Sequence, residues 1–127
     1  MAVLRLRVRP GFEDLVFRFP YGRGQWLDRQ DVNHTYINLG NQDLTPDQER
    51  FLSSPGILSW HIVKEVSEAL SEARRWAREL ARRLDTYPDP AGVYADLQYA
   101  YWRRVAERLG ATRAELADID KVFLEEV

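Results

Sequence analysis

The sequence contains no cysteine, one methionine and only two lysines. Without cysteine there can be no disulfide, no thiolate metal ligand and no cysteine nucleophile. No apolar run approaches the length needed to cross a bilayer, and the first ten residues lack the continuous apolar segment of a signal peptide. We therefore expect a cytoplasmic protein that is not attached to a membrane.

The residues that are present are typical of one ordinary globular domain. Of the 127 residues, 45% are hydrophobic and 30% are charged, and the formal net charge is −2. The charge is unevenly spread, because residues 1–30 carry six arginines against three acids, whereas residues 114–127 carry five acids against Lys121. Such opposite ends can steer a protein partner or a second copy, and solvated faces explain the same pattern.

Alternation with a period of two predicts strands near the N-terminus. In VLRLRVR, Leu4 and Leu6 alternate with arginines, and LVFRF at 15–19 alternates in the same way. Pro10 and Gly11 lie between these segments and are typical of a turn, so we expect an antiparallel hairpin. A third strand is predicted within VNHTYINLG at 32–40.

Apolar spacing of three and four residues predicts helices after residue 45. Thr45 and Gln48 form the pattern of a capping box at the start of a short helix. A longer helix is predicted over 57–84 from a seam of apolar residues: Val63, Val66, Leu70, Ala73, Ala77, Leu80 and Leu84.

Two further helices are predicted by their first and last residues. Asp89 begins a helix that runs to Leu109 and is stopped by Gly110, and Thr112 begins the last one. The predicted fold class is therefore α+β in a single domain. A small N-terminal antiparallel sheet of two to three strands occupies residues 1–40. A helical bundle of one short and three longer helices occupies residues 45–127.

The helix at 90–109 has more apolar surface than one core requires. Its apolar and aromatic residues cover an arc of roughly 200°, whereas a helix facing one core needs little more than about 100°. Either the rest of the chain buries the excess, or a partner does. Interfaces concentrate tyrosine, tryptophan and arginine. The residues predicted for a protein interface are Tyr94, Tyr99, Tyr101, Trp102, Arg104 and Arg108.

A second candidate surface is basic and lies near the N-terminus. Arginines beside aromatic rings can hold phosphates and stack on bases. The residues predicted for a nucleic acid or an acidic partner are Arg5, Arg7, Arg9 and Arg18 on one strand face, with Arg23 and Trp26 in the following loop. Arginines on the outer side of a strand also protect a small sheet from aggregation, so this alternative stays open.

Catalytic motifs are largely missing from the sequence. Asp28, Asp31 and His34 have side chains that can bind a divalent metal, but the spacing sends them to alternating faces of a strand. The chain has neither a phosphate-binding glycine loop nor a G-x-S-x-G motif. We therefore expect no cofactor and no enzymatic activity.

The stretch VAERLGATRAELADIDKVF, residues 105–123, resembles a helix-turn-helix in the spacing of its small and apolar residues. The second helix of this pair carries several acids, among them Glu115, Asp118 and Asp120, and phosphates would repel it. A capped turn between two packed helices accounts for the same residues, and we expect that arrangement.

These features favour a small, non-catalytic, protein-binding regulator or adaptor that docks on a larger protein assembly. It would form a homodimer through the long helix or through Tyr94, Tyr101 and Trp102, or bind an unrelated protein. A phage-encoded modulator of host machinery would have this size and composition. The alternative is a nucleic-acid-binding protein that uses the arginine-rich strand face.

Overall fold

The computed structural model describes residues 1–125 and has an α+β fold. The chain divides into two compact units, residues Met1–Lys64 and Glu65–Val127. We call them the sheet unit and the helical unit. Among residues 1–125, no helix combines the length and the apolarity that crossing a bilayer requires.

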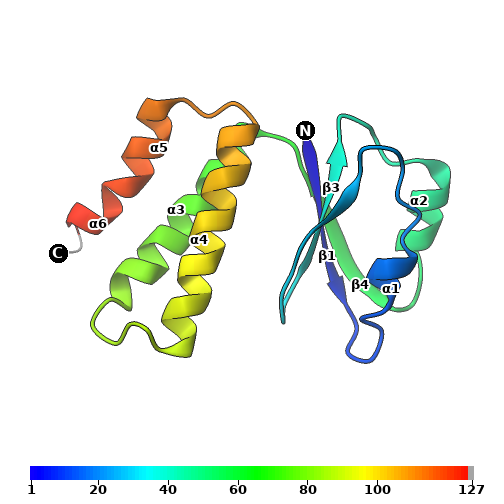
Figure 1. Cartoon of the computed structure of the whole chain (residues 1–127), viewed down its shortest axis with the longest axis horizontal. Coiled ribbons are helices and arrows are strands. Elements are labelled where there is room, and N and C mark those ends of the chain that lie inside the picture. The colour runs from blue at the N-terminus through cyan, green and yellow to red at the C-terminus, as the bar shows by residue number, and fades with distance from the viewer. Residues whose placement is uncertain (126–127) are drawn as a thin grey trace. The chain divides into compact units, whose positions relative to one another are not determined.

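The sheet unit contains four antiparallel strands in the spatial order β2-β3-β1-β4 (Figure 1). They are β1 (Ala2–Val8), β2 (Trp26–Gln30), β3 (Thr35–Gly40) and β4 (Ile57–Val63). The predicted strands near residues 3–9 and 32–40 are confirmed as β1 and β3. The sheet is larger than predicted and is not confined to the first 40 residues, because β4 follows a helix.

Two short helices cover one face of this sheet, α1 (Leu15–Arg18) and α2 (Pro46–Leu52) (Figure 1). Their apolar residues pack on Leu4 and Leu6 of β1 and on the neighbouring strand β3. The core cluster consists of Leu4, Leu6, Leu15, Val16, Phe19, Ile37, Leu39, Leu52 and Ile57. Because side chains alternate along a strand, Arg5 and Arg7 point to the opposite face of β1.

The predicted hairpin between residues 3–9 and 15–19 is wrong. Leu15 and Val16 are consecutive, and both are buried, whereas a strand would send them to opposite faces. The one helical turn of α1 lets both reach the core. β1 pairs instead with β3 and β4, which are distant in sequence.

The predicted helix over 57–84 is also wrong in its first part. Residues 57–63 form β4, and the helix α3 spans Val66–Arg82. Leu58, Trp60 and Ile62 alternate with Ser59 and His61, which is a strand pattern that the heptad seam obscured. The side of β1 that does not pair with β3 supplies hydrogen-bonding partners for residues 57–63. This pairing favours a strand over a helix in these residues.

The helical unit consists of α3, α4 (Pro90–Arg108), α5 (Arg113–Asp120) and α6 (Val122–Glu125) (Figure 1). The helices α3 and α4 lie side by side along their length. Of the predicted seam on α3, four residues are buried: Leu70, Ala73, Ala77 and Leu80. Val63 belongs to β4 instead, and Leu84 is exposed.

The predicted helix ends are confirmed where capping residues define them. The side chain of Asp89 accepts a hydrogen bond from the backbone N–H of Gly92, and Thr45 and Thr112 each form a complete capping box. Gly110 follows α4 with φ = 108°, a left-handed conformation that side-chain-bearing residues rarely adopt. Short-range chemistry was sufficient to fix these boundaries.

Candidate functional site

The outer face of α4 carries an exposed stripe that is apolar at one end and basic at the other. Its members recur at intervals of three and four residues, so they lie on one side of the helix. Val93 is 36% exposed and Leu97 is 52% exposed. We define the α4 stripe as Val93, Leu97, Ala100, Arg104 and Arg108, all of which are exposed.

Tyr87 lies beside the apolar end of the α4 stripe. Its ring is exposed, yet it packs beside the first turn of α4, where a Cβ added to Gly92 would lie 3.2 Å from the ring. The Tyr87 hydroxyl donates a hydrogen bond of 3.0 Å to Asp96. This bond and the charge of Asp96 raise the pKa of Tyr87 above its ordinary value. The hydrogen bond holds the ring beside the first turn of α4.

The residues predicted for a protein interface divide into three groups. Tyr101 and Trp102 are 1% and 0% exposed, and their rings meet edge to face. Tyr94 and Tyr99 are half-buried, and Tyr94 contacts Trp76 of α3 edge to face at 5.4 Å. Arg104 and Arg108 are exposed and belong to the α4 stripe. Of the six residues, only this last pair is exposed, and the guanidinium group of Arg104 also lies over the ring of Tyr101, 5.4 Å from its centre.

Tyr99 takes part in a polar link between α4 and α5. Its hydroxyl donates to Asp120, which also accepts hydrogen bonds of 3.2 and 3.0 Å from the guanidinium group of Arg103. Burial, followed by the bond to Asp120, raises the pKa of Tyr99 to about 12. Burial alone would raise the pKa of Asp120, but the two donors and the charge of Arg103 lower it overall. This link holds α5 on α4.

The arginines predicted for nucleic acid do not share one surface. Arg5 and Arg7 point to the face of β1 opposite the core cluster, whereas Arg18 lies on α1, which covers the core face. Arg9 follows β1, and its Nε donates to the carbonyl oxygen of Pro55 at 3.2 Å. Arg23 is exposed in a loop before β2, and Trp26 is exposed at the start of β2. The fold distributes these six side chains over several elements.

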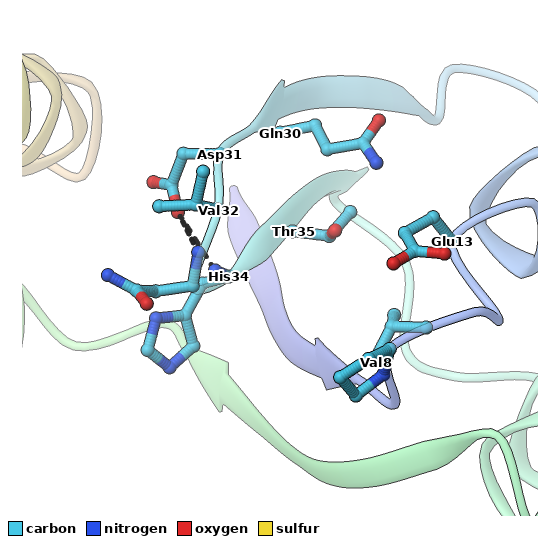
Figure 2. Close-up of a pocket in the computed structure, with 9 residues that line it drawn as sticks. Val8, Glu13, Gln30, Asp31, Val32, His34 and Thr35 are labelled. Atoms are coloured by element: carbon cyan, nitrogen blue, oxygen red, sulfur yellow. Dashed lines mark hydrogen bonds between the residues drawn. The ribbon is translucent and has the colours of Figure 1, made fainter.

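The residues considered as metal ligands lie on the hairpin between β2 and β3, which borders a small hollow (Figure 2). The Oδ1 atom of Asp31 accepts hydrogen bonds from the backbone N–H groups of Asn33 and His34, at 2.8 and 2.9 Å. Asp28 accepts instead from the indole of Trp26 at 3.4 Å. In the part of the chain that is described, no three His, Asp or Glu side chains come together as a metal site.

The hollow itself is small. It has a volume of about 90 Å³ and is lined by Glu13, Asp31 and His34 among others. Backbone hydrogen bonds from Glu13 and Gly11 lower the pKa of the Glu13 carboxyl. Pockets that bind small-molecule ligands usually exceed about 300 Å³. The hollow therefore has room for a few waters rather than for a cofactor.

Sequence reasoning missed the exposed apolar residues of β4. Leu58 is 43% exposed and Trp60 is 45% exposed, on the outermost strand of the sheet. Phe12 lies beside the start of this strand, because a Cβ added to Gly56 would lie 2.8 Å from its ring. The alternation of residues 58–62 after the SSPG turn was the signal that could have revealed this edge.

Comparison with protein-family models, with curated proteins and with solved structures gives no match to this chain.

Proposed function

We propose that this protein is a small, non-catalytic regulator or adaptor that binds a larger protein assembly. The observation that carries the proposal is the α4 stripe, in which exposed apolar residues continue into exposed arginines along one helix face. Exposed apolar patches with a polar rim mark protein-binding sites. The α4 stripe keeps Arg104 and Arg108 from the interface predicted from sequence. Exposed apolar residues take the place of the buried rings of Tyr101 and Trp102.

The chemistry of the stripe defines the partner surface. Val93, Leu97 and the ring of Tyr87 would fill an apolar groove, and burying them removes apolar area from water at roughly 25 cal/mol per Å². Arg104 and Arg108 lie about two and three turns beyond Leu97 along the helix and would meet carboxylates at the rim of that groove. The partner is therefore a protein with an apolar groove beside an acidic patch.

Affinity capture from the native host with the full chain tests this proposal. We expect discrete proteins to be retained by the wild type and lost with L97E, because a buried carboxylate would face the apolar groove. Leucine and glutamate have similar helix propensities, so L97E should leave α4 folded. V32E is the matched control, because Val32 is a 94% exposed apolar residue of the sheet unit, outside the stripe.

The same capture separates protein binding from the nucleic-acid alternative. R104E together with R108E should weaken retention and reduce its dependence on salt, because rim charges act mainly through screened electrostatics. Retention that ignores L97E would contradict the proposal. Binding to heparin that is lost when Arg5, Arg7 and Arg9 are changed to serine would favour a nucleic-acid partner instead.

A further inference from the structure

The exposed side chains of α3 belong to arginine and serine. They recur at intervals of three and four residues, so they lie on one side of the helix, opposite the buried alanines. We define the α3 face as these exposed residues: Ser67, Ser71, Arg75, Arg78 and Arg82. All residues of α3 are described, and none of its exposed residues is apolar, aromatic or acidic.

This composition differs from that of the α4 stripe. A protein interface has an apolar centre, and the α3 face has no exposed apolar side chain to supply one. Single-stranded nucleic acids bind by stacking their bases on aromatic rings, which the α3 face also lacks. Arginine and serine side chains are, however, among those that contact the phosphates of a duplex. The α3 face therefore fits a phosphate backbone better than it fits a protein.

The arginines of the α3 face are held only by weak ion pairs. Arg75 lies 3.6 Å from Glu72 and Arg82 lies 2.9 Å from Glu79, and the side chains of both arginines are about two thirds exposed. Ion pairs between such exposed side chains contribute little free energy. Within residues 1–125, Arg78 makes no ion pair. All three guanidinium groups are therefore available to an anion.

The spacing of the arginines suits a row of phosphates. Arg75 and Arg82 are seven residues apart, which is about 10 Å along the helix axis. One strand of a duplex presents a phosphate about every 3.4 Å along its axis, so this length faces about three phosphates. The planar guanidinium group matches phosphate oxygens with two parallel hydrogen bonds. Ser71 lies one turn before Arg75 and can donate a further hydrogen bond.

We propose that the α3 face binds the phosphate backbone of a nucleic-acid duplex, without reading its base sequence. Each of the three arginines contacts one phosphate. The formal net charge of the chain is −2, so attraction to a polyanion has to come from such a local surface. The α3 face shares no residue with the α4 stripe or with the N-terminal arginines, and it adds a second binding surface to the proposed adaptor.

Fluorescence anisotropy of a labelled DNA duplex of mixed sequence, titrated with the full chain, tests this proposal. Three phosphate contacts should give a slope of about −2.7 when the logarithm of the association constant is plotted against that of the salt concentration. The affinity should then fall about 40-fold between about 50 and 200 mM salt. R78Q together with R82Q should reduce the slope to about −0.9, because one contact remains.

E79Q should have the opposite effect. Glu79 accepts hydrogen bonds from Arg82 and Arg83, so its replacement frees both guanidinium groups, and the duplex should bind more tightly. An increase in affinity after a substitution cannot be caused by unfolding. E79Q therefore keeps the proposal testable if R78Q with R82Q fails to fold, which far-UV circular dichroism would show.

R50Q together with R113Q is the matched control. It removes the same number of positive charges from exposed positions outside the α3 face, so the slope should equal that of the wild type. A single strand of the same sequence should bind more weakly than the duplex, because the α3 face has no ring on which bases could stack.

Four results would overturn the proposal. The first is a wild-type chain that does not bind the duplex at low salt, and the second is a slope that stays unchanged in R78Q with R82Q. The third is binding that is lost only when Arg5, Arg7 and Arg9 are changed to serine. The fourth is a single strand that binds more tightly than the duplex. Each result leaves the proposal for the α4 stripe unaffected, because L97E tests that separately.

Discussion

The core of the sheet unit and helix α3 of the helical unit bury side chains of different sizes. The sheet unit fills its core with large aliphatic residues from β1, α1, β3, α2 and β4, which are spread from Leu4 to Ile57 in the sequence. In the helical unit, Ala69, Ala73 and Ala77 of α3 are fully buried, and α3 packs side by side with α4, which buries the large rings of Tyr101 and Trp102. Large residues fill volume between a sheet and its helices, whereas small residues let two helix axes approach. The core of the sheet unit should therefore be sensitive to a loss of volume, and the buried alanines of α3 should be sensitive to added volume.

The polar interactions differ in the same way. In the sheet unit, the amide of Gln48 donates to the carbonyl oxygen of Pro20 at 3.0 Å and to the side-chain oxygen of Gln25 at 2.6 Å. Gln48 is fully buried and Gln25 nearly so. In the helical unit, Arg103 and Asp120 form their pair with side chains that are 33% and 39% exposed. A polar bond contributes differently according to its access to water.

The largest expected effect is the loss of volume from the sheet unit. I37A should lower the free energy of unfolding by about 2–5 kcal/mol, because it leaves a cavity in a fully buried site on β3. Urea denaturation followed by circular dichroism measures the change. V32A, at a 94% exposed site, should stay within about 0.5 kcal/mol of the wild type. An equal loss in both variants would contradict the assignment of the core.

The opposite change should damage the helical unit. A73L should cost about 1–3 kcal/mol, because the added atoms enter a closely packed region of α3 that has no space for them. The same denaturation experiment applies, with R78L as the control because Arg78 is exposed on the same helix. A73L that is as stable as the wild type would show that Ala73 is not at a close contact.

The two capping boxes allow a comparison between a buried and an exposed residue at the same position of the box. Q48A should cost about 1–3 kcal/mol, because it removes the donor to the carbonyl oxygen of Pro20 and one of the two donors to the side-chain oxygen of Gln25. E115A removes the residue at the same position of the other box, where it is exposed, and should cost only about 0.5–1 kcal/mol. Thermal unfolding of both variants measures the difference. Equal losses of stability in Q48A and E115A would mean that Gln48 stabilises the protein only through its capping box.

The smallest expected effect is electrostatic and depends on pH. The folded pKa of Asp120 lies below its ordinary value of 3.8, so its contribution is present above that pH and is lost as the pH falls through the folded pKa. Tyr99 is the reverse case: its contribution is full below pH 10 and is lost between 10 and about 12. Because Arg103 and Asp120 are partly exposed, the pair should contribute less than about 1 kcal/mol.

Alkaline titration followed by tyrosinate absorbance tests this link directly. One tyrosine should titrate near pH 12 in the wild type. D120N removes the charge that the tyrosinate would face, so the pKa of Tyr99 should move toward 10. D118N is the control, because Asp118 pairs with Arg74 and has no bond to Tyr99. A late-titrating tyrosine that is unchanged in D120N would contradict the role of Asp120.

The helical unit could be predicted largely from its sequence. Asp89, Gly110 and Thr112 act on backbone groups within a few residues, so their effects can be read from neighbouring letters. The apolar positions Leu116 and Ile119 are buried as their spacing indicated. The α4 stripe was only partly predicted. The spacing of residues 90–109 places Tyr101 and Trp102 in the same apolar arc as the stripe, and spacing alone does not show which side of that arc the rest of the chain buries.

The sheet unit was predicted less well because its strands are stabilised by partners that are distant in sequence. Residues 57–63 fit a heptad seam as well as an alternating strand, and only the open side of β1 favours the strand. Residues 15–19 alternate like a strand, but Leu15 and Val16 both reach the core when the chain turns helical. Trp60 was therefore placed on a helix, and its exposure at a sheet edge went unnoticed.

The sequence by itself determined the α+β class, the capped helix ends, the absence of thiol chemistry and the excess apolar character of residues 90–109. These follow from composition or from interactions between near neighbours. The tertiary structure alone decided the four-strand order, the position of Trp60 at an open edge, and which residues of α4 face outward. These depend on backbone pairing and burial between segments far apart in the chain, which local patterns do not encode.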